Sequence, residues 1–270
     1  MPGTVSPASS DPTLAQLLEA GRVEVGCFTD EELQAVGADR EAPFQRSPAP
    51  DRVSSQPEDL REPILATALR SLIARGVVRP PTEEQLAGGE AEGQVDLDTT
   101  GELQFVLSVR SNPSMLAFVG QEEYFGMLHG LQPDQGGGFL EERVSPQGLH
   151  YFTVFSRAAM VEWLVSRVDP RGLTPDEVLP PQGRQALPPA VTEAIRVLAP
   201  GATRLDAYHR KSAGDRRIRF GVHVAPDATW VVTSAFGVDP QLETALRVDQ
   251  AGLRANLSAV LTDSDPSSGG

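Results

Sequence analysis

Cysteine and long apolar runs are both scarce in this 270-residue sequence. Cys27 is the only cysteine, which excludes an intramolecular disulfide or a cysteine-rich metal site and favours a reducing compartment. No apolar run approaches the roughly 18 to 20 residues that span a membrane. Residues 1–12 also lack the basic start and the apolar centre of a secretory signal. We therefore expect a cytoplasmic protein without a membrane span.

Positive charge is scarce as well. The sequence has 23 lysines and arginines against 37 aspartates and glutamates, a net charge of −14, and Lys211 is the only lysine. Binding to nucleic acid or to an anionic membrane needs clustered cations that neutralise phosphates. The composition therefore opposes binding to either by the whole surface, although a local basic patch remains open as an anion site.

Recognisable catalytic motifs are absent. No GxSxG serine motif occurs, and the run Gly136–Gly138 lacks the GKS or GKT ending of a phosphate-binding loop, so we interpret it as a hairpin turn. The histidines do not lie at metal-ligand spacing from one another, from the cysteine or from paired carboxylates; they are His129, His150, His209 and His223. We assign no role to His150 and His223, and we predict no catalytic residue, cofactor or metal site.

Two further groups of reactive side chains favour a structural interpretation. Glu141 and Glu142 are neighbours on a predicted strand, so their side chains point to opposite faces and do not form a converging acid–base pair. We expect such carboxylates to pair with arginine across the strands. We interpret Cys27 as a packed, unreactive thiol.

The pattern of apolar residues predicts an α+β fold. Helices are expected at residues 13–20, 62–75, 101–110, 157–168, 190–198 and 250–261, with a short one that follows Thr29 and ends near residue 36. Strands are expected at residues 22–26, 115–119, 124–130, 139–144, 149–155, 203–209, 217–224, 229–235 and 243–248. The short separation of these strands by turn residues is typical of an antiparallel meander.

Several helix ends have recognisable capping residues. Thr29 and Glu32 have the spacing of a capping box, and Ser156 and Asp249 precede apolar helical patterns as N-caps. In the helix at 62–75, we place Pro63 in the first turn and Gly76 at the C-terminal cap.

The order of elements suggests a quasi-two-fold repeat of helix, antiparallel strand meander and helix. Residues 99–168 and 190–261 would be the two copies, joined by a proline-rich linker at 169–189. Residues 13–98 would form an N-terminal helical and strand region with an acidic loop, and residues 1–12 and 262–270 have the composition of disordered tails. The alternative is that the similarity of the two segments is a coincidence. Strand–turn–helix units are common, and any two of them have similar capping residues and spacing for physical reasons. Such a scaffold without convergent catalytic groups favours binding over catalysis.

One segment inverts the charge of the chain. Residues 209–219 concentrate positive charge between two predicted strands, and the candidate partner-binding residues there are Arg210, Lys211, Arg216 and Arg217. These residues either bind an acidic partner or form a solvated turn whose charge nearby acidic residues compensate.

The order of elements resembles the EspG family, the cytosolic specificity chaperones of type VII (ESX) secretion systems in actinobacteria. The similarity lies in the helix with the sequence ALRSLIARGVV (residues 68–78), in the passage through Asn112-Pro113, and in the strand-to-helix transitions at Phe155-Ser156 and Val248-Asp249. It extends over residues 62–261. The resemblance implies a quasi-two-fold α/β architecture and a protein partner, a PE/PPE-like helical heterodimer whose apolar tip the chain would cover.

Two other functions remain open on the residues alone. The helix at 62–75 and a following strand pair would suit a regulatory or nucleic-acid-associated winged-helix protein, although the loop after that helix is acidic rather than basic. An enzyme with a site between the two repeats is the other alternative, because pockets often form at such interfaces.

Overall fold

A computed structural model describes residues 14–37, 52–80, 98–121, 125–177, 184–186, 188–210, 216–235 and 244–262. The helices are α1 (Leu14–Glu19), α2 (Asp30–Ala35), α3 (Glu58–Ala74), α5 (Gly101–Ser111), α6 (Arg157–Val168), α7 (Pro189–Val197) and α8 (Gln250–Thr262), with a 3-10 turn, η1, at Pro133–Gln135. The strands are β1 (Arg22–Thr29), β2 (Met115–Gly120), β3 (Phe125–Gly130), β4 (Phe139–Val144), β5 (Leu149–Phe155), β6 (Arg184–Ala186), β7 (Ala202–His209), β8 (Arg216–Ala225), β9 (Ala228–Ala235) and β10 (Thr244–Val248).

The strands form one ten-stranded sheet in the order β1-β5-β4-β3-β2-β7-β8-β9-β10-β6. All of its strand pairs are antiparallel, which confirms the α+β class and the predicted meander. The two halves join where β2 pairs with β7, from Met115 opposite His209 to Gly120 opposite Arg204. Each half has the order helix, four strands, helix, which by itself does not show duplication.

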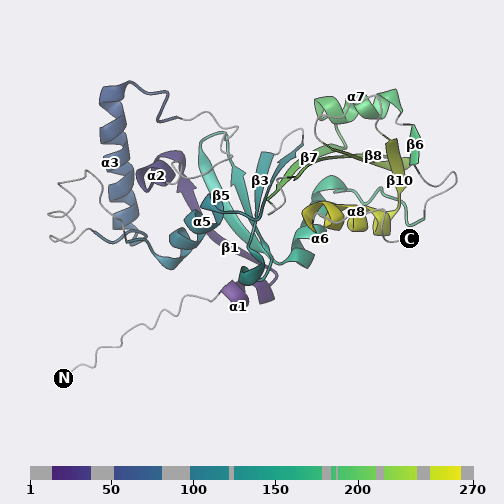
Figure 1. Cartoon of the computed structure of the whole chain (residues 1–270). Helices are drawn as coiled ribbons and strands as arrows, with labels where there is room; N and C mark the ends of the chain where they lie inside the picture. Colours follow the sequence, from purple (N-terminus) through teal and green to yellow (C-terminus); the bar gives the residue numbers. More distant parts are fainter. Residues whose placement is uncertain are drawn as a thin grey trace.

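The helices cover the two faces of the sheet unequally. In Figure 1, α6 and α8 lie side by side on one face of β7–β10, and α7 lies on the other. The core between the sheet and the helices α6 and α8 contains Phe139, Phe155, Leu164, Phe220 and Leu257. A second core lies on the α7 side of the sheet in the first half, where α2, α3 and α5 pack on β1, β4 and β5. The face of β1, β5 and β4 on the α6 side thus has little helical cover beyond α6 itself.

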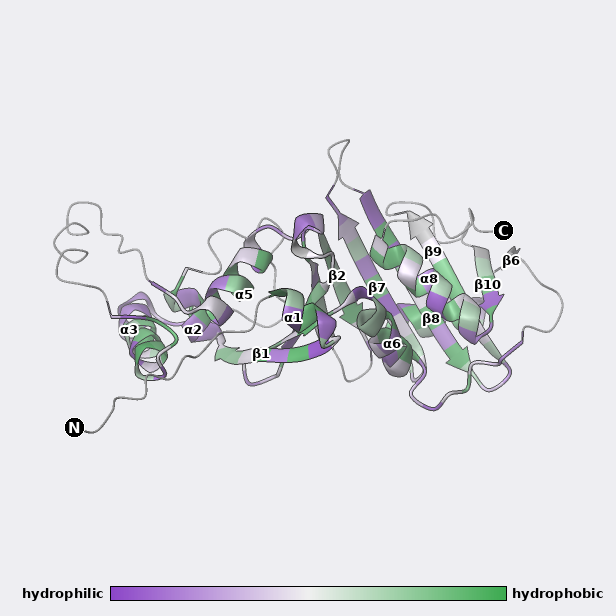
Figure 2. Cartoon of the chain, turned by 90° about the horizontal axis from the view of Figure 1, so that it is seen from below, coloured by the Kyte–Doolittle hydropathy of each residue, from purple (hydrophilic) through white to green (hydrophobic). Residues whose placement is uncertain are grey.

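Side-chain alternation along the strands determines which residues face each core. On β4, Phe139 belongs to the α6 and α8 core and Leu140 to the α5 core. Figure 2 shows the same alternation along β1, where hydrophilic and hydrophobic segments follow one another. A bulge between Glu24 and Gly26 interrupts the pairing of β1 with β5.

The predicted caps are confirmed at three helices. Thr29 accepts a hydrogen bond from the backbone N–H of Glu32, and the Glu32 carboxylate accepts one from the Thr29 N–H, which completes the capping box of α2. Ser156 caps α6 by accepting from the N–H of Ala159 at 3.3 Å, and Asp249 accepts from the N–H of Gly252 at the start of α8. Short polar side chains at these positions satisfy the otherwise unpaired first-turn donors.

Gly76 follows α3 with φ +72, as its predicted place at the C-terminal cap requires. The start of this helix corrects a prediction. Glu58 begins α3, four residues before the expected start, so Pro63 lies inside the helix and not in its first turn. Pro57 is the N-cap, and the missing N–H of Pro63 leaves one carbonyl of the helix without its usual donor.

The linker prediction also needs correction, because residues 169–189 contain β6, a three-residue edge strand paired with β10. Tertiary pairing creates this strand, since its sequence has no apolar alternation. The predicted strand at residues 22–26 corresponds to β1, which extends further, to Thr29. The acidic loop at 82–98 and the connection at 41–56 lie largely outside the described residues.

No helix in the described ranges is both long enough and apolar enough to cross a membrane.

Candidate functional site

A buried cluster of charged side chains lies between α5, α2 and the strands β3, β4 and β5. Glu142 is at its centre, with 0% of its side chain exposed. Its Oε2 accepts from Nε of Arg110 at 3.1 Å and lies 2.8 Å from Nε2 of His129. Its Oε1 lies 2.6 Å from Nδ1 of His150, whose Nε2 lies 2.5 Å from Oδ1 of Asp30. The cluster therefore connects two helices to three strands.

The charges in this cluster stabilise one another. Burial disfavours the charge of Glu142, but Arg110 and the hydrogen bonds from the two histidines outweigh it and hold the pKa of Glu142 well below its usual range. Burial likewise disfavours protonated His150, but hydrogen bonds to Asp30 and Glu142 raise the pKa of His150 to about 9. His150 is therefore a cation at neutral pH, held between two carboxylates.

The cluster is a structural element and not an accessible reactive centre. The side chains of Arg110, His129 and His150 are each no more than 3% exposed, so a substrate has no contact with them. Within the described part of the chain, no group of three or more histidine, cysteine, aspartate or glutamate side chains could hold a metal ion.

Sequence reasoning missed this cluster, since it gave His150 no role and expected cross-strand arginine as the partner of Glu142. The arginine comes from α5 and the other partners from neighbouring strands. The only sequence signal was an ionisable residue at a core-facing position of β3, β4 and β5. Glu141 and Glu142 do face opposite sides, as predicted.

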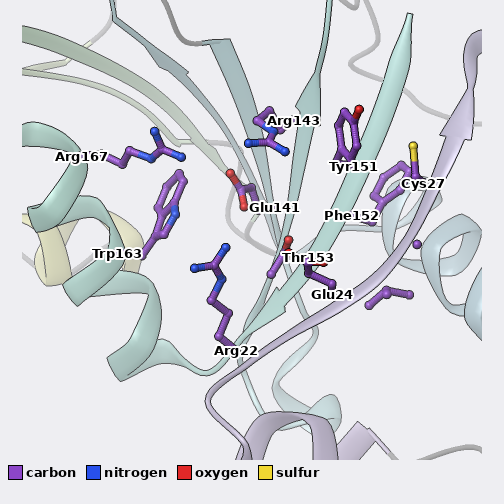
Figure 3. A pocket seen from close by; sticks show the side chains of 12 residues that line it. Arg22, Glu24, Cys27, Glu141, Arg143, Tyr151, Phe152, Thr153, Trp163 and Arg167 are labelled. Atoms are coloured by element: carbon purple, nitrogen blue, oxygen red, sulfur yellow. The ribbon is translucent and has the colours of Figure 1, made fainter.

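An open cavity of about 460 Å³ lies on the opposite face of the same strands. Its floor consists of β1, β5 and β4, and its wall is α6, which contributes Trp163 and Arg167. In Figure 3, Arg22, Arg143 and Arg167 extend toward the middle of the cavity, with Glu141 between them in this view.

Each of the three arginines stacks on an aromatic ring. The guanidinium carbon of Arg143 lies 4.7 Å from the ring centroid of Tyr151, and that of Arg167 lies 5.4 Å from Trp163. Arg22 lies 5.5 Å from Phe155 in the same way. Cation–π contact holds a guanidinium in a fixed plane with less loss of hydration than an ion pair. The cavity thus presents three positioned cations.

A second cavity of about 540 Å³ shares Arg143 and Arg167 with the first. It lies between the two halves, because Gln121 and the end of α6 form one side and the connection from α7 to β7, at Ala199–Thr203, forms the other. The Gln121 amide donates to the Arg167 carbonyl and to Oγ1 of Thr203, both at 2.8 Å, and so fixes this junction. We call these two cavities, which share Arg143 and Arg167, the arginine groove.

Cys27 is among the residues that line the first cavity. Burial raises the pKa of its thiol, and the opposing effect of Arg75 does not reverse this. A thiol with a raised pKa is a weak nucleophile at neutral pH, so the geometry favours the predicted unreactive role.

The described residues of the predicted basic segment do not line the arginine groove. Arg210 donates to Oδ1 of Asn112, and Arg217 lies 5.2 Å from the ring of Tyr208. Arg216 begins β8 and is exposed, and Lys211 lies outside the described residues. Arg210, Arg216 and Arg217 are at the far end of β7 from Thr203, about 20 Å away at roughly 3.3 Å per strand residue.

The other two histidines and the glycine run have ordinary surroundings. His209 donates from Nε2 to the carbonyl of Val260 at 2.8 Å, and burial lowers the pKa of His223. Gly136 and Gly137 have positive φ in the connection between β3 and β4, where a turn was predicted.

Comparison with known proteins leaves the family of this chain open. No family model matches it, and no curated protein matches it. Among solved structures, it is similar to the Mycobacterium tuberculosis type VII secretion system chaperone EspG5, solved in complex with a PE25-PPE41 dimer. The two chains are 7% identical, the match covers 90% of this chain and 96% of that chain, and the TM-score is 0.48. At this identity and TM-score, the two chains have only a weak similarity of fold, which carries no argument about function.

Proposed function

We propose that this chain is a non-catalytic protein-binding module that holds a partner in the arginine groove. The observation that carries the proposal is the contrast between the groove and the buried cluster. The groove is open and presents arginines positioned on aromatic rings, an arrangement enriched where proteins bind one another. Glu142 and His150, the groups best suited to acid–base catalysis, are instead buried in the core.

The partner class comes from the resemblance of the sequence to the EspG family. The chain would be a cytosolic chaperone or adaptor that covers a secreted helical substrate, such as a PE/PPE-like heterodimer, for a type VII-like secretion system. Covering an apolar tip keeps such a substrate from aggregating, and the net charge of −14 keeps the complex in solution.

Two further features belong to this proposal. Residues 99–168 and 190–261 would be copies of one unit, with the second cavity of the groove at the junction of the copies. Arg210, Lys211, Arg216 and Arg217 would be a separate electrostatic contact that orients the partner on approach.

The two alternative functions have less support. A winged-helix role would require a strand pair after α3, and the described residues there form one isolated bridge, between Val78 and Thr99. For an enzyme with a site between the halves, arginines are the only ionisable side chains among the described residues that line the second cavity. Arginines cannot serve as a general acid–base pair near neutral pH.

The proposal is tested by recovering the tagged chain from its native cytosol and measuring partners by mass spectrometry and complex mass by light scattering. We expect a stoichiometric complex with a small helical protein for the wild type and for Arg196→Glu, a control on the exposed surface of α7. Arg143→Glu should lose that partner while it keeps the wild-type circular dichroism spectrum. Recovery without a partner, or equal recovery with Arg143→Glu, would contradict the proposal.

A further inference from the structure

We infer that the arginine groove recognises an acidic peptide segment of its partner, with one carboxylate between Arg22 and Arg143 and small apolar residues over the second cavity. This inference rests on the proposed function and specifies the chemistry of the ligand.

The first support is the state of the two arginines. Within the described part of the chain, Arg22 and Arg143 have ring contacts and no ion pair with a carboxylate. A stacked guanidinium keeps its N–H edge available, and that planar edge matches the two oxygens of a carboxylate. No described carboxylate forms an ion pair with either side chain, so both are available to a ligand carboxylate in addition to Glu141, which lies between the arginines in Figure 3.

The second support is the charge of the first cavity. Among the described residues that line it are three arginines and two carboxylates, Glu24 and Glu141, which gives a surplus of one positive charge on a chain with a net charge of −14. A side-chain carboxylate has one negative charge and matches that surplus. A phosphate group has about −1.5 to −2 at neutral pH and would meet repulsion from both glutamates. The charge balance therefore favours an acidic side chain over a phosphate.

The third support is the neutral character of the second cavity. Apart from the two shared arginines, the described residues that line it are neutral, and small or apolar ones predominate; these are Val168, Pro170, Ala199, Pro200, Gly201 and Ala202. Gly201 has φ +81, and a β-carbon there would lie 2.6 Å from the carbonyl oxygen of Val224, so this wall cannot easily accept a larger residue. The two cavities, which adjoin at Arg143 and Arg167, suit an extended segment in which an acidic residue lies beside small apolar residues.

The test is selection of a random decapeptide library on the immobilised full-length protein. We expect the wild type to enrich peptides that have aspartate or glutamate beside small apolar residues. The double variant Arg22→Gln/Arg143→Gln should lose the acidic enrichment, and Arg196→Gln should keep it. Replacing the acidic residue of a selected peptide by its amide should weaken binding about tenfold, the loss expected for one charge-assisted contact.

Three outcomes would overturn the inference. If peptides are selected without an acidic residue and bind the double variant equally well, the carboxylate inference fails while protein binding by the groove survives. If the native partner is recovered in the pull-down but no peptide is selected, recognition by a linear acidic segment is wrong. If inorganic phosphate or ATP displaces a selected peptide at micromolar concentration, the groove is a site for small anions instead.

Discussion

Glu142 and Arg143 are adjacent on β4, yet they occupy opposite environments. Glu142 faces the α5 core, is fully buried and has three charge-assisted contacts. Arg143 faces the open groove and stacks on Tyr151. Because neighbouring side chains on a strand point to opposite faces, the charge of Glu142 stabilises the core while the charge of Arg143 lies in the open groove.

The difference between the two faces is one of desolvation. A charge in the core costs free energy unless partners replace its lost hydration, so removal of one member leaves the others unpaired. A charge on the open face retains water, so its removal changes binding more than stability. Three predictions follow this contrast, from the largest expected effect on stability to the smallest.

Glu142→Gln should lower the free energy of unfolding by about 3–5 kcal/mol, because Arg110 and protonated His150 lose their central anion. Urea denaturation at pH 7 measures the change, and Glu24→Gln, an exposed glutamate on β1, is the matched control. A loss below about 1 kcal/mol for Glu142→Gln would mean that the cluster does not depend on this charge.

The free energy of unfolding should fall between pH 6.5 and pH 9, by about 3 kcal/mol from His150 alone. The pKa of His150 is raised to about 9 in the folded protein, so its stabilisation is fully present below the ordinary value near 6.5 and is lost as the pH rises through 9. The lowered pKa of Glu142 acts in the opposite direction, and its stabilisation is lost as the pH falls below the ordinary value of 4.5.

Urea denaturation at several pH values measures this dependence, with His150→Gln as the comparison. The variant should be less stable at pH 6.5 and should lose much of the slope above that pH. The same slope in both proteins would show that His150 is not the group that titrates.

Arg143→Gln should lower the free energy of unfolding by less than about 1 kcal/mol, since it removes one exposed cation–π contact. Thermal or urea denaturation checks this value beside that of Glu142→Gln. A loss as large as that of Glu142→Gln would mean that the groove arginines serve the fold, which would remove the contrast between the two faces.

The sequence predicted much of the fold because its signals are local. The bounds of β4, β5 and α6 coincide with those predicted, since apolar periodicity, turn residues and the cap at Ser156 all act within a few positions. The start of α3 and the strand β6 were not predicted. Pro63 favours a helix start near it, whereas α3 begins at Glu58. The strand β6 exists through its pairing with β10, which is distant in the sequence.

The site was harder to predict than the fold. Arg210, Arg216 and Arg217 of the predicted basic segment lie away from the groove, and whether the segment binds a partner stays a prediction. Arg22, Arg143 and Arg167 come from β1, β4 and α6, and Arg22 lies more than a hundred positions before the other two. Nothing local distinguishes these three from other arginines.

The sequence alone therefore determined the α+β class, most element positions and the caps, because short-range periodicity and hydrogen bonding specify them. Only the tertiary structure decided that Glu142 meets Arg110, His129 and His150 in the core, and that three arginines meet in one groove on the opposite face. The physical reason is that charge acts according to distance and burial, and both depend on which strands become neighbours in the sheet.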